Sequence, residues 1–570
     1  MKNWNIPIVW FVVLASSALT GCRQQSIVQQ EGEMTLMDSM VVSNDMAVDN
    51  YLSRQQTSPD SKWLGGISDQ YGIYNPGSVA SIMQRLAVAY MHETSQYFQA
   101  DSLLERMILA MDYLLSVQHD DGTIDLLSTN FHSTPDLAFA VERIALCYRL
   151  FSMDDQEATT DLMGKYRSFL LKGGEALKVG GIHTPNHRWV VSMALAWLYE
   201  LFGDEEYRQR ANEWLNENID IDQDGQYTER STSVYSPLTN RCLLTIARIL
   251  NKPELYQHVR KNLRMTIYYM HPNGEVVTEA SRRQDQYRAK YPSTYYYPYR
   301  YLAQLDQDST FGAMTQLLEH QLSKSQLSAS LIYLLTDENV GDRYPVGVLP
   351  EQYARNFPGS SLARIRDGNV DATILAHNPA FFTLHNGPAV LQAVRLASAF
   401  FGKGQFQADT IIVEEDKYIL KQYLEGPYYQ PYPVERLPTD GDWEKMPKSN
   451  RPQSEVQKLN ATIEIAKRNG VFDLDFSLEG TDHVPVALEL AFRKGGVIEG
   501  ITSAPIGGDS YLMEAESGLY KMEGSSIRFG PRRQEHGWTQ LRGADPKIDA
   551  TSVYITGFTP FSYRLSLVSE

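Results

Sequence analysis

Four proline-containing helix starts recur along the first half of the chain, at intervals of roughly fifty to sixty residues. They are Asn75-Pro76, Thr134-Pro135, Thr184-Pro185 and Ser236-Pro237. A polar N-cap side chain accepts a hydrogen bond from a free backbone N–H, and a proline in the first turn has no N–H to leave unpaired. Each interval is long enough for one outgoing and one returning helix. The pattern therefore predicts a series of helical hairpins.

Apolar residues at helical spacing predict the helices themselves. Among them are residues 79–98, 101–118, 136–152, 186–202, 205–216 and 238–250. Asp-Gly and Asn-Gly turns lie at 120–125, 222–229 and 271–279, which places short hairpins at one end of the bundle. Repeated helix pairs are typical of a solenoid or a closed α/α toroid. Closure is favoured because the array stops after roughly five units.

The second half of the chain has a different pattern of hydrophobic and polar residues. It alternates in hydrophobicity and is rich in β-branched and aromatic residues, with Gly or Asn turns between segments. Examples are 371–387, 409–424, 461–480, 484–496 and 552–568. This pattern predicts antiparallel strands in a β-sandwich. The expected organisation is an α/α toroid over 59–355 followed by a sandwich over 356–570.

The N-terminus has the pattern of an export signal. Residues 1–21 combine Lys2 with a short apolar run, and Leu19 to Cys22 resemble a bacterial lipobox. This resemblance implies cleavage before Cys22 and lipidation of that cysteine. Residues 22–58 are polar without a sustained period, which predicts a lipidated tether. Arg23, with no acidic cluster behind it, favours a periplasm-facing anchor in the outer membrane; the cell surface is the alternative.

Net charge and the positions of the cysteines argue against nucleic-acid binding and against a structural zinc site. The formal net charge of −17 argues against a nucleic-acid binder, although a local basic cleft can still bind an anionic substrate. Cys147 and Cys242 lie in apolar helical patterns and are expected to be buried free thiols. No Cys/His spacing typical of a structural zinc site is present, and no metal or cofactor is predicted. Nothing in the sequence indicates the oligomeric state.

The helix start at Thr184-Pro185 carries an unusual number of polar groups. Asn186 and His187 fall in the first turn of the predicted helix, His183 precedes it and Arg188 follows. Backbone N–H groups and the helix dipole make this end favourable for an anion. Asn186 and His187 are therefore candidates for a catalytic role, and His183 and Arg188 for substrate binding.

The neighbouring repeats place similar side chains near their own helix starts. These are Asn130 and His132 before Pro135, Glu229, Arg230 and Tyr235 before Pro237, and Arg282 and Arg283 after the turn at His271. If successive repeats stack around one axis, these helix starts converge on one cleft. Such a cleft would hold Asn, His, Tyr and Arg side chains together.

Those residue types suit proton abstraction next to a carboxylate. The C5 proton of a uronic acid becomes acidic only when its carboxylate charge is offset by hydrogen-bond donors or Arg. A base must then remove the proton, and an acid must protonate the departing O4. A tyrosine serves for either step if nearby positive charge lowers its pKa, and Tyr235 beside Arg230 is the candidate.

Taken together, the lipobox, the predicted toroid with Asn186-His187 and Tyr235, and the C-terminal β domain resemble the toroid-plus-sandwich polysaccharide lyases. That group includes heparinase II/III-like, alginate, hyaluronate and chondroitin lyases. Residues 381–406 also resemble the strand segment that opens the sandwich in such proteins.

The resemblance implies metal-independent β-elimination on a uronate-containing oligo- or polysaccharide, leaving a 4,5-unsaturated product. By the same resemblance, Asn186 or Asn130 neutralises the carboxylate. His187 is the base or a carboxylate partner, and Tyr235 is the acid, or both acid and base. Two Asn/His pairs compete for these roles.

Two other functions fit parts of the sequence. A glycoside hydrolase on an α/α barrel needs a pair of carboxylates. Candidates are Asp120, Asp121, Asp125, Asp136, Asp222 and Asp224, although the Asp-Gly contexts suit turns better. A non-catalytic glycan-binding lipoprotein would need aromatic platforms, whereas the tyrosine run at 295–301 is expected to pack rather than to stack on sugars. Among His377, His385, His483 and His536 most are expected to be structural, and one could reach the cleft.

Overall fold

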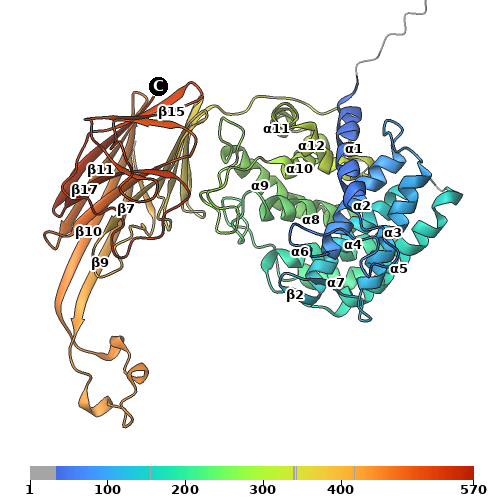
Figure 1. Cartoon of the computed structure of the whole chain (residues 1–570), viewed down its shortest axis with the longest axis horizontal. Coiled ribbons are helices and arrows are strands. Elements are labelled where there is room, and N and C mark those ends of the chain that lie inside the picture. Colours follow the sequence, from blue (N-terminus) through green and yellow to red (C-terminus); the bar gives the residue numbers. More distant parts are fainter. Residues whose placement is uncertain (1–33, 155, 338–339, 342, 416) are drawn as a thin grey trace, which may run out of the picture.

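The protein is described from a computed structural model, which covers residues 34–154, 156–337, 340–341, 343–415 and 417–570. A helical domain and a β domain lie side by side, and the chain crosses between them once, after α13 (Figure 1). The signal segment, the lipobox and Cys22 lie outside the described residues. Within the described residues, no helix is long and apolar enough to span a membrane.

The helical domain is an α/α toroid built from the predicted hairpins. Its helices are α1 (Leu36–Arg54), α2 (Pro76–Met91), α3 (Asp101–Val117), α4 (Thr134–Phe151), α5 (Thr160–Val179), α6 (Pro185–Phe202), α7 (Glu205–Leu215), α8 (Tyr235–Ile249), α9 (Tyr256–Tyr268), α10 (Tyr296–Leu305), α11 (Ser309–Gln321), α12 (Lys324–Leu327) and α13 (Leu331–Thr336). Helices α2, α4, α6, α8 and α10 contact one another in sequence, and α3, α5 and α7 pack outside them. Because α13 returns to contact α2 and α4, one continuous core fills the domain.

Helix α1 corrects the prediction of a structureless tether up to residue 58. A capping box formed by Thr35 and Asp38 starts the helix, and Met40, Val48 and Tyr51 are buried against the toroid. The apolar face is narrow and interrupted by polar residues, so the composition concealed it. In the tyrosine run, Tyr295, Tyr296 and Tyr299 are buried, as the packing interpretation predicted.

The helix starts follow the predicted rule only in part. Asn75 accepts a hydrogen bond from the N–H of Gly77, as expected. At α4 the cap is Ser133 rather than Thr134. Thr184 is the N-cap of α6, but its hydroxyl donates to Asn186 Oδ1 over 2.8 Å instead of accepting. Helix α8 begins at Tyr235, so this tyrosine lies in the first turn and not ahead of it.

Short hairpins do gather around the predicted turns. The first turn leads into β1 (Ile124–Leu126), which pairs with β2 (Asn130–Ser133). The second and third turns are closed by single bridges between Ile221 and Tyr227 and between Met270 and Val276. The loops that follow these bridges carry the remaining candidate residues.

The β domain is a sandwich of two eight-stranded sheets. One sheet has the order β14-β17-β12-β7-β6-β5-β4-β3, with β3 (Gln352–Phe357), β4 (Leu362–Asp367), β5 (Val370–Leu375), β6 (Phe382–Asn386), β7 (Ala389–Ser398), β12 (Pro485–Phe492), β14 (Ser510–Leu512) and β17 (Thr551–Phe558). The other has the order β13-β15-β16-β18-β11-β10-β9-β8, with β8 (Ile411–Glu414), β9 (Lys417–Tyr429), β10 (Gln453–Arg468), β11 (Val471–Gly480), β13 (Val497–Glu499), β15 (Gly518–Met522), β16 (Ser525–Gly530) and β18 (Phe561–Ser569). All the ladder pairings are antiparallel except β14 with β17.

A second apolar core fills the space between the two sheets. The β9–β10 hairpin extends well beyond the sandwich body (Figure 1). Cys147 and Cys242 are buried and free, as predicted.

Candidate active site

A groove of about 700 Å³ opens on the toroid between α1, α2, β1 and α4. Asp125, Asp136 and Phe139 line one part of it, and Arg54, Arg85 and Arg143 also contribute to its wall. The ring of Phe139 lies edge-on to His187, with 6.4 Å between ring centroids. The groove therefore adjoins the start of α6, where the sequence placed its densest cluster of polar residues.

Asn186 and His187 are buried or half-buried in the first turn of α6. The side-chain Nδ2 of Asn186 and the Nδ1 of His187 are both buried and have no hydrogen-bond partner. Burial, together with the neighbouring His183, lowers the pKa of His187 to about 4. His187 is therefore neutral near pH 7. Two unpaired nitrogens at a positive helix end form a site that an oxygen-rich anion could complete.

Tyr235, Arg283 and Glu229 form the opposite part of the site. The Arg283 guanidinium lies over the Tyr235 ring, 5.0 Å from its centroid, and its Nε is 3.4 Å from Glu229 Oε2. The hydrogen bond with Tyr235 is the main cause that raises the pKa of Arg283. Gln284 Nε2 also donates to the Tyr235 hydroxyl over 3.1 Å.

Glu229 connects the two halves of this arrangement. Its Oε1 lies 3.5 Å from the backbone nitrogen of Asn186, while its Oε2 faces Arg283. The positive charge of Arg283 also contributes to the lowered pKa of His187, so the two halves interact electrostatically. The structure thus brings together Asn186, His187, Glu229, Tyr235 and Arg283.

Arg230 does not take the place expected for it beside Tyr235. Its guanidinium donates to the carbonyl oxygens of Gly359 and Ser360, over 3.1 and 3.4 Å, at the entry to the sandwich. Its own carbonyl accepts from the backbone N–H of Arg282 over 2.7 Å. Arg283 therefore replaces Arg230 as the cation next to the tyrosine. Arg282 is largely exposed. Partial desolvation of its guanidinium, and then the charge of Arg230, lowers its pKa.

Asn130 and His132 occupy the β1–β2 side of the site. Asn130 Nδ2 donates to Asp136 Oδ2 over 3.0 Å, and Asp136 raises the pKa of His187 against the effect of burial. His132 is exposed, pairs with Asp121 at 2.7 Å and stacks on His119 at 3.9 Å. Asn130 thus reaches the site through Asp136, whereas the contacts of His132 are with the turn.

His183 and Arg188 flank α6 in different directions. The His183 ring meets the His187 ring edge-on, with centroids 4.8 Å apart. Arg188 forms ion pairs with Asp220 at 2.9 Å and Glu217 at 3.2 Å. Its charge is therefore already compensated by the segment after α7, which does not support the expected substrate contact.

Sequence reasoning missed the three groove arginines and Asp136 as a partner of His187. Arg54 donates to the carbonyl of Ser68, and Arg143 to that of Gly77. Arg85 donates to Asn44 and Ser328. Among the described residues none of these three arginines has a carboxylate ion-pair partner. They lie on three separate helices, and no local motif connects them. Only the packing of these helices in the folded toroid brings the three arginines to one groove.

The architecture is that of the toroid-and-sandwich polysaccharide lyases, which confirms the predicted fold. No family model and no curated protein matches the sequence. Among solved structures, the chain is similar to heparinase III, with a TM-score of 0.58 and 10% identity over 94% of this chain and 86% of that one. It is also similar to the chondroitin AC lyase of Streptomyces coelicolor A3, with a TM-score of 0.50 and 14% identity over 93% and 79%. The Paenibacillus xanthan lyase gives 0.53 and 11% over 93% and 57%.

Proposed function

We propose that this protein is a polysaccharide lyase that cleaves a uronic-acid-containing glycan by β-elimination. The observation that carries the proposal is the pair of unpaired buried nitrogens, Asn186 Nδ2 and His187 Nδ1, at the start of α6, where Arg283 acts on His187 and lies over the Tyr235 ring. Fold similarity to heparinase III and to chondroitin AC and xanthan lyases supports it.

In the proposed reaction, the substrate carboxylate binds at the helix start. The Asn186 amide donates a hydrogen bond to it, and the α6 dipole and Arg283 offset its negative charge. This neutralisation stabilises the negative charge that develops when the C5 proton leaves. Glu229 holds Arg283 in place and keeps it from swinging into solvent.

His187 and Tyr235 share the proton transfers. Neutral His187 takes the C5 proton, and the Tyr235 hydroxyl gives a proton to O4 as the C4–O4 bond breaks and the C4–C5 double bond forms. The lowered pKa of His187 keeps its unprotonated form available at neutral pH. In the alternative assignment, Tyr235 performs both transfers and His187 binds the carboxylate.

The groove suits a substrate with more than one acidic group. Arg54, Arg85 and Arg143 line it and have only neutral partners among the described residues. A guanidinium recognises carboxylate or sulfate oxygens with two parallel hydrogen bonds. Repeated acidic sugars along the groove would meet these cations in turn.

A hydrolase would need two free carboxylates, and five of the six aspartates suggested for that role are engaged, whereas Asp120 is fully exposed on the surface. Asp121 and Asp125 pair with His132 and His119. Asp136 accepts from Ser133 and Asn130. Asp222 and Asp224 accept from Ser360 at the domain junction. These contacts favour structural roles for them.

The test is an assay of the purified protein on a panel of uronate-containing glycans. A lyase creates a conjugated C4–C5 double bond, so ultraviolet absorbance should rise in step with new reducing ends. Reducing ends without absorbance would indicate a hydrolase. Binding without either signal would indicate a glycan-binding protein.

We also propose that the mature chain is attached to the outer membrane through a lipid on Cys22, facing the periplasm. The lipobox sequence supports this attachment. A Cys22→Ser variant should move from the membrane fraction to the soluble fraction. Equal membrane association of both forms would contradict the proposal.

A further inference from the structure

The β9–β10 hairpin leaves the sandwich as a separate arm (Figure 1). Strand β8 pairs with β9 only as far as Leu420, and β11 pairs with β10 only from Leu459 onward. Among the described residues, those between these two points, 421–458, pair in the sheet only with each other, and we call this segment the arm. An isolated two-stranded hairpin is at best marginally stable in water. The arm therefore adds little stability to the sandwich, and its side chains are free to contact another molecule.

Large apolar side chains are exposed all along the arm. The exposed residues are Tyr423, Tyr428, Tyr429, Val434, Leu437, Trp443 and Val456. Tyr428 and Trp443 are each 59% exposed. Gathered exposed apolar side chains mark binding surfaces, whereas single ones scattered over a protein do not. Because four of these seven residues are aromatic, the arm is suited to a ligand with flat apolar faces.

Trp443, near the end of the arm, is supported by its neighbours. The Arg451 guanidinium lies over the Trp443 ring, 4.5 Å from its centroid, and over the buried ring of Tyr432 at 5.3 Å. The Tyr432 hydroxyl in turn accepts a hydrogen bond from Asn450 Nδ2 over 3.1 Å. These contacts support one face of the indole, although the residue as a whole is largely exposed. Trp443 therefore presents a flat apolar surface to solvent in a fixed orientation.

Two tyrosines at the end of β9 are supported in a similar way. The Lys448 ammonium lies over the Tyr429 ring, 5.8 Å from its centroid. Phe401, from the turn after β7, meets the Tyr428 ring edge-on, with centroids 5.6 Å apart. Because Tyr428 and Tyr429 are successive residues of one strand, their side chains point to opposite faces of the arm. The arm thus carries supported aromatic rings on both of its faces.

The two cations that support these rings lack acidic partners. Among the described residues, neither Arg451 nor Lys448 forms an ion pair with a carboxylate. Arg451 donates to the Gln430 carbonyl over 3.3 Å, and its Nε is buried without a hydrogen-bond partner. Lys445, by contrast, is paired with Asp440. Positive charge beside the exposed rings is therefore available to an anionic ligand.

We propose that the arm binds an acidic polysaccharide at a site outside the cleft. Trp443, Tyr428 and Tyr429 stack on sugar rings, whose C–H faces are apolar. Arg451 and Lys448 pair with the carboxylate or sulfate groups of the same chain. A protein partner is disfavoured because Lys, Glu and Asp are depleted at the centre of protein interfaces, whereas the end of the arm, residues 430–452, contains all three.

The position of the arm agrees with this role. Figure 1 shows its end on the opposite side of the molecule from the start of α1. With the proposed lipid anchor on the N-terminal side, the arm extends away from the membrane and not into it. No residue of the arm lines the groove beside α6, so the two sites are separate. The acidic class of the glycan rests on the proposed function.

The test is the affinity of the purified full chain for hyaluronate, chondroitin sulfate and alginate, measured by retardation in gels that contain each polymer. Neutral dextran is the control polymer. At least one acidic polymer should retard wild type, and Trp443→Ala should bind it at least about fivefold more weakly. Trp443→Phe keeps an aromatic ring and should stay within about twofold of wild type. Trp538→Ala, at an exposed tryptophan outside the arm, should match wild type.

The charge of the arm is tested separately. Lys448→Gln should weaken the binding and make it less sensitive to salt, because one cation no longer faces the acidic polymer. If none of the three acidic polymers retards wild type, or if wild type and Trp443→Ala are retarded equally, the proposal is overturned.

Turnover separates this inference from the proposed function. Trp443→Ala should cleave a short acidic oligosaccharide within about twofold of the wild-type rate, but should cleave the long polymer more slowly. Binding through the arm without any new double bond would contradict the lyase and support the arm. Lyase activity with equal polymer binding by wild type and Trp443→Ala would do the reverse. A dimer that Trp443→Ala converts to a monomer in sedimentation, with unchanged glycan binding, would make the arm a contact between copies and overturn the proposal.

Discussion

The cleft at α6 and the junction between toroid and sandwich both bury polar side chains, but they differ in how many of the buried polar groups have hydrogen-bond partners. At the junction, the Arg364 guanidinium donates to Thr373 and to the carbonyls of Tyr268 and Met270, and it pairs with Asp371. At the cleft, nitrogens of Asn186 and His187 remain unpaired. An unpaired buried group costs about 1–3 kcal/mol of stability. The contrast indicates that the junction is organised for stability and the cleft for a ligand.

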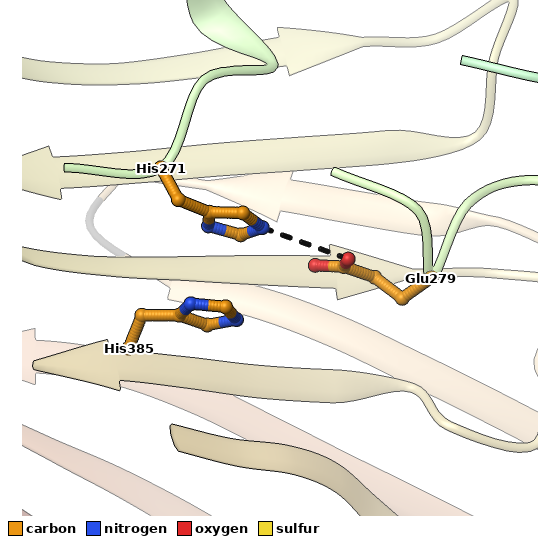
Figure 2. A group of neighbouring side chains, drawn as sticks. All are labelled: His271, Glu279 and His385. Atoms are coloured by element: carbon orange, nitrogen blue, oxygen red, sulfur yellow. Dashed lines mark ion pairs between the residues drawn. The ribbon is translucent and has the colours of Figure 1, made fainter. Parts of the chain in front are cut away.

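The junction also contains a few buried polar atoms without a partner. The unpaired atoms there include His385 Nδ1 and Asp371 Oδ1. The His385 ring stacks on that of His271 (Figure 2), and Asp371 pairs with His271.

The largest expected effect is on the junction. Arg364→Met should lower the free energy of unfolding by about 3–5 kcal/mol, because it leaves the Asp371 carboxylate buried without its cation. Denaturant unfolding measures the change. Arg366→Met, on the same strand, is the control because Arg366 donates only to a surface turn at Gly368. Equal losses of stability in both variants would show that the buried ion pair at the junction contributes no more than a surface contact.

At the cleft we expect a loss of activity rather than a loss of stability. Asn186→Ala should lower kcat/KM by about 10²–10³-fold, the usual effect of removing one donor to a developing negative charge. Stability should change little, because the variant removes the unsatisfied Nδ2 group but also the hydrogen bond that Thr184 donates to Asn186 Oδ1. Steady-state kinetics and thermal unfolding together check this. A stability loss without an activity loss would assign Asn186 to the scaffold.

The pH dependence of stability should reveal His187. Its pKa in the folded protein, about 4, lies below the unfolded value of 6.5, so folding favours the neutral ring. Its contribution is fully present above pH 6.5 and is lost as the pH falls toward 4. His187→Gln should therefore lose less stability between pH 7 and pH 4.5 than wild type in denaturant titrations. Parallel losses would mean that the ring is not desolvated.

The smallest effect is expected at Arg188. Arg188→Lys keeps the charge beside Asp220 and Glu217, so stability should change by less than about 1 kcal/mol. Because the Arg188 guanidinium is already paired with Asp220 and Glu217, kcat/KM should stay within about twofold of wild type. A large rise in KM would indicate that Arg188 contacts the substrate.

Local sequence signals predicted the features that depend on a short segment of the chain, such as the start of a helix. The cap and proline at Thr184-Pro185 correctly put Asn186 and His187 in a first helical turn, and the tyrosine at the next start also reached the site. The cation beside Tyr235 was assigned to Arg230, which is nearer in sequence. The chain turns at Arg230, where φ is +46°, and sends that side chain to the sandwich.

Features built from distant segments could not be predicted in this way. His385 and His271 are separated by more than a hundred residues, so no local motif indicated that their rings stack at the junction. Asp136 and His187 are brought near each other by the packing of α4 against α6. Helix α1 was missed because its apolar face is sparse and its cap lies inside a polar stretch.

The central claim is that Tyr235 transfers a proton in β-elimination at this cleft. The most direct test compares wild type with Tyr235→Phe on the best glycan of the panel, following ultraviolet absorbance. The account predicts a rise in absorbance with wild type and a rate at least about 10²-fold lower for the variant, with binding and melting temperature unchanged. Equal rates for the two proteins, or cleavage without absorbance, would contradict it.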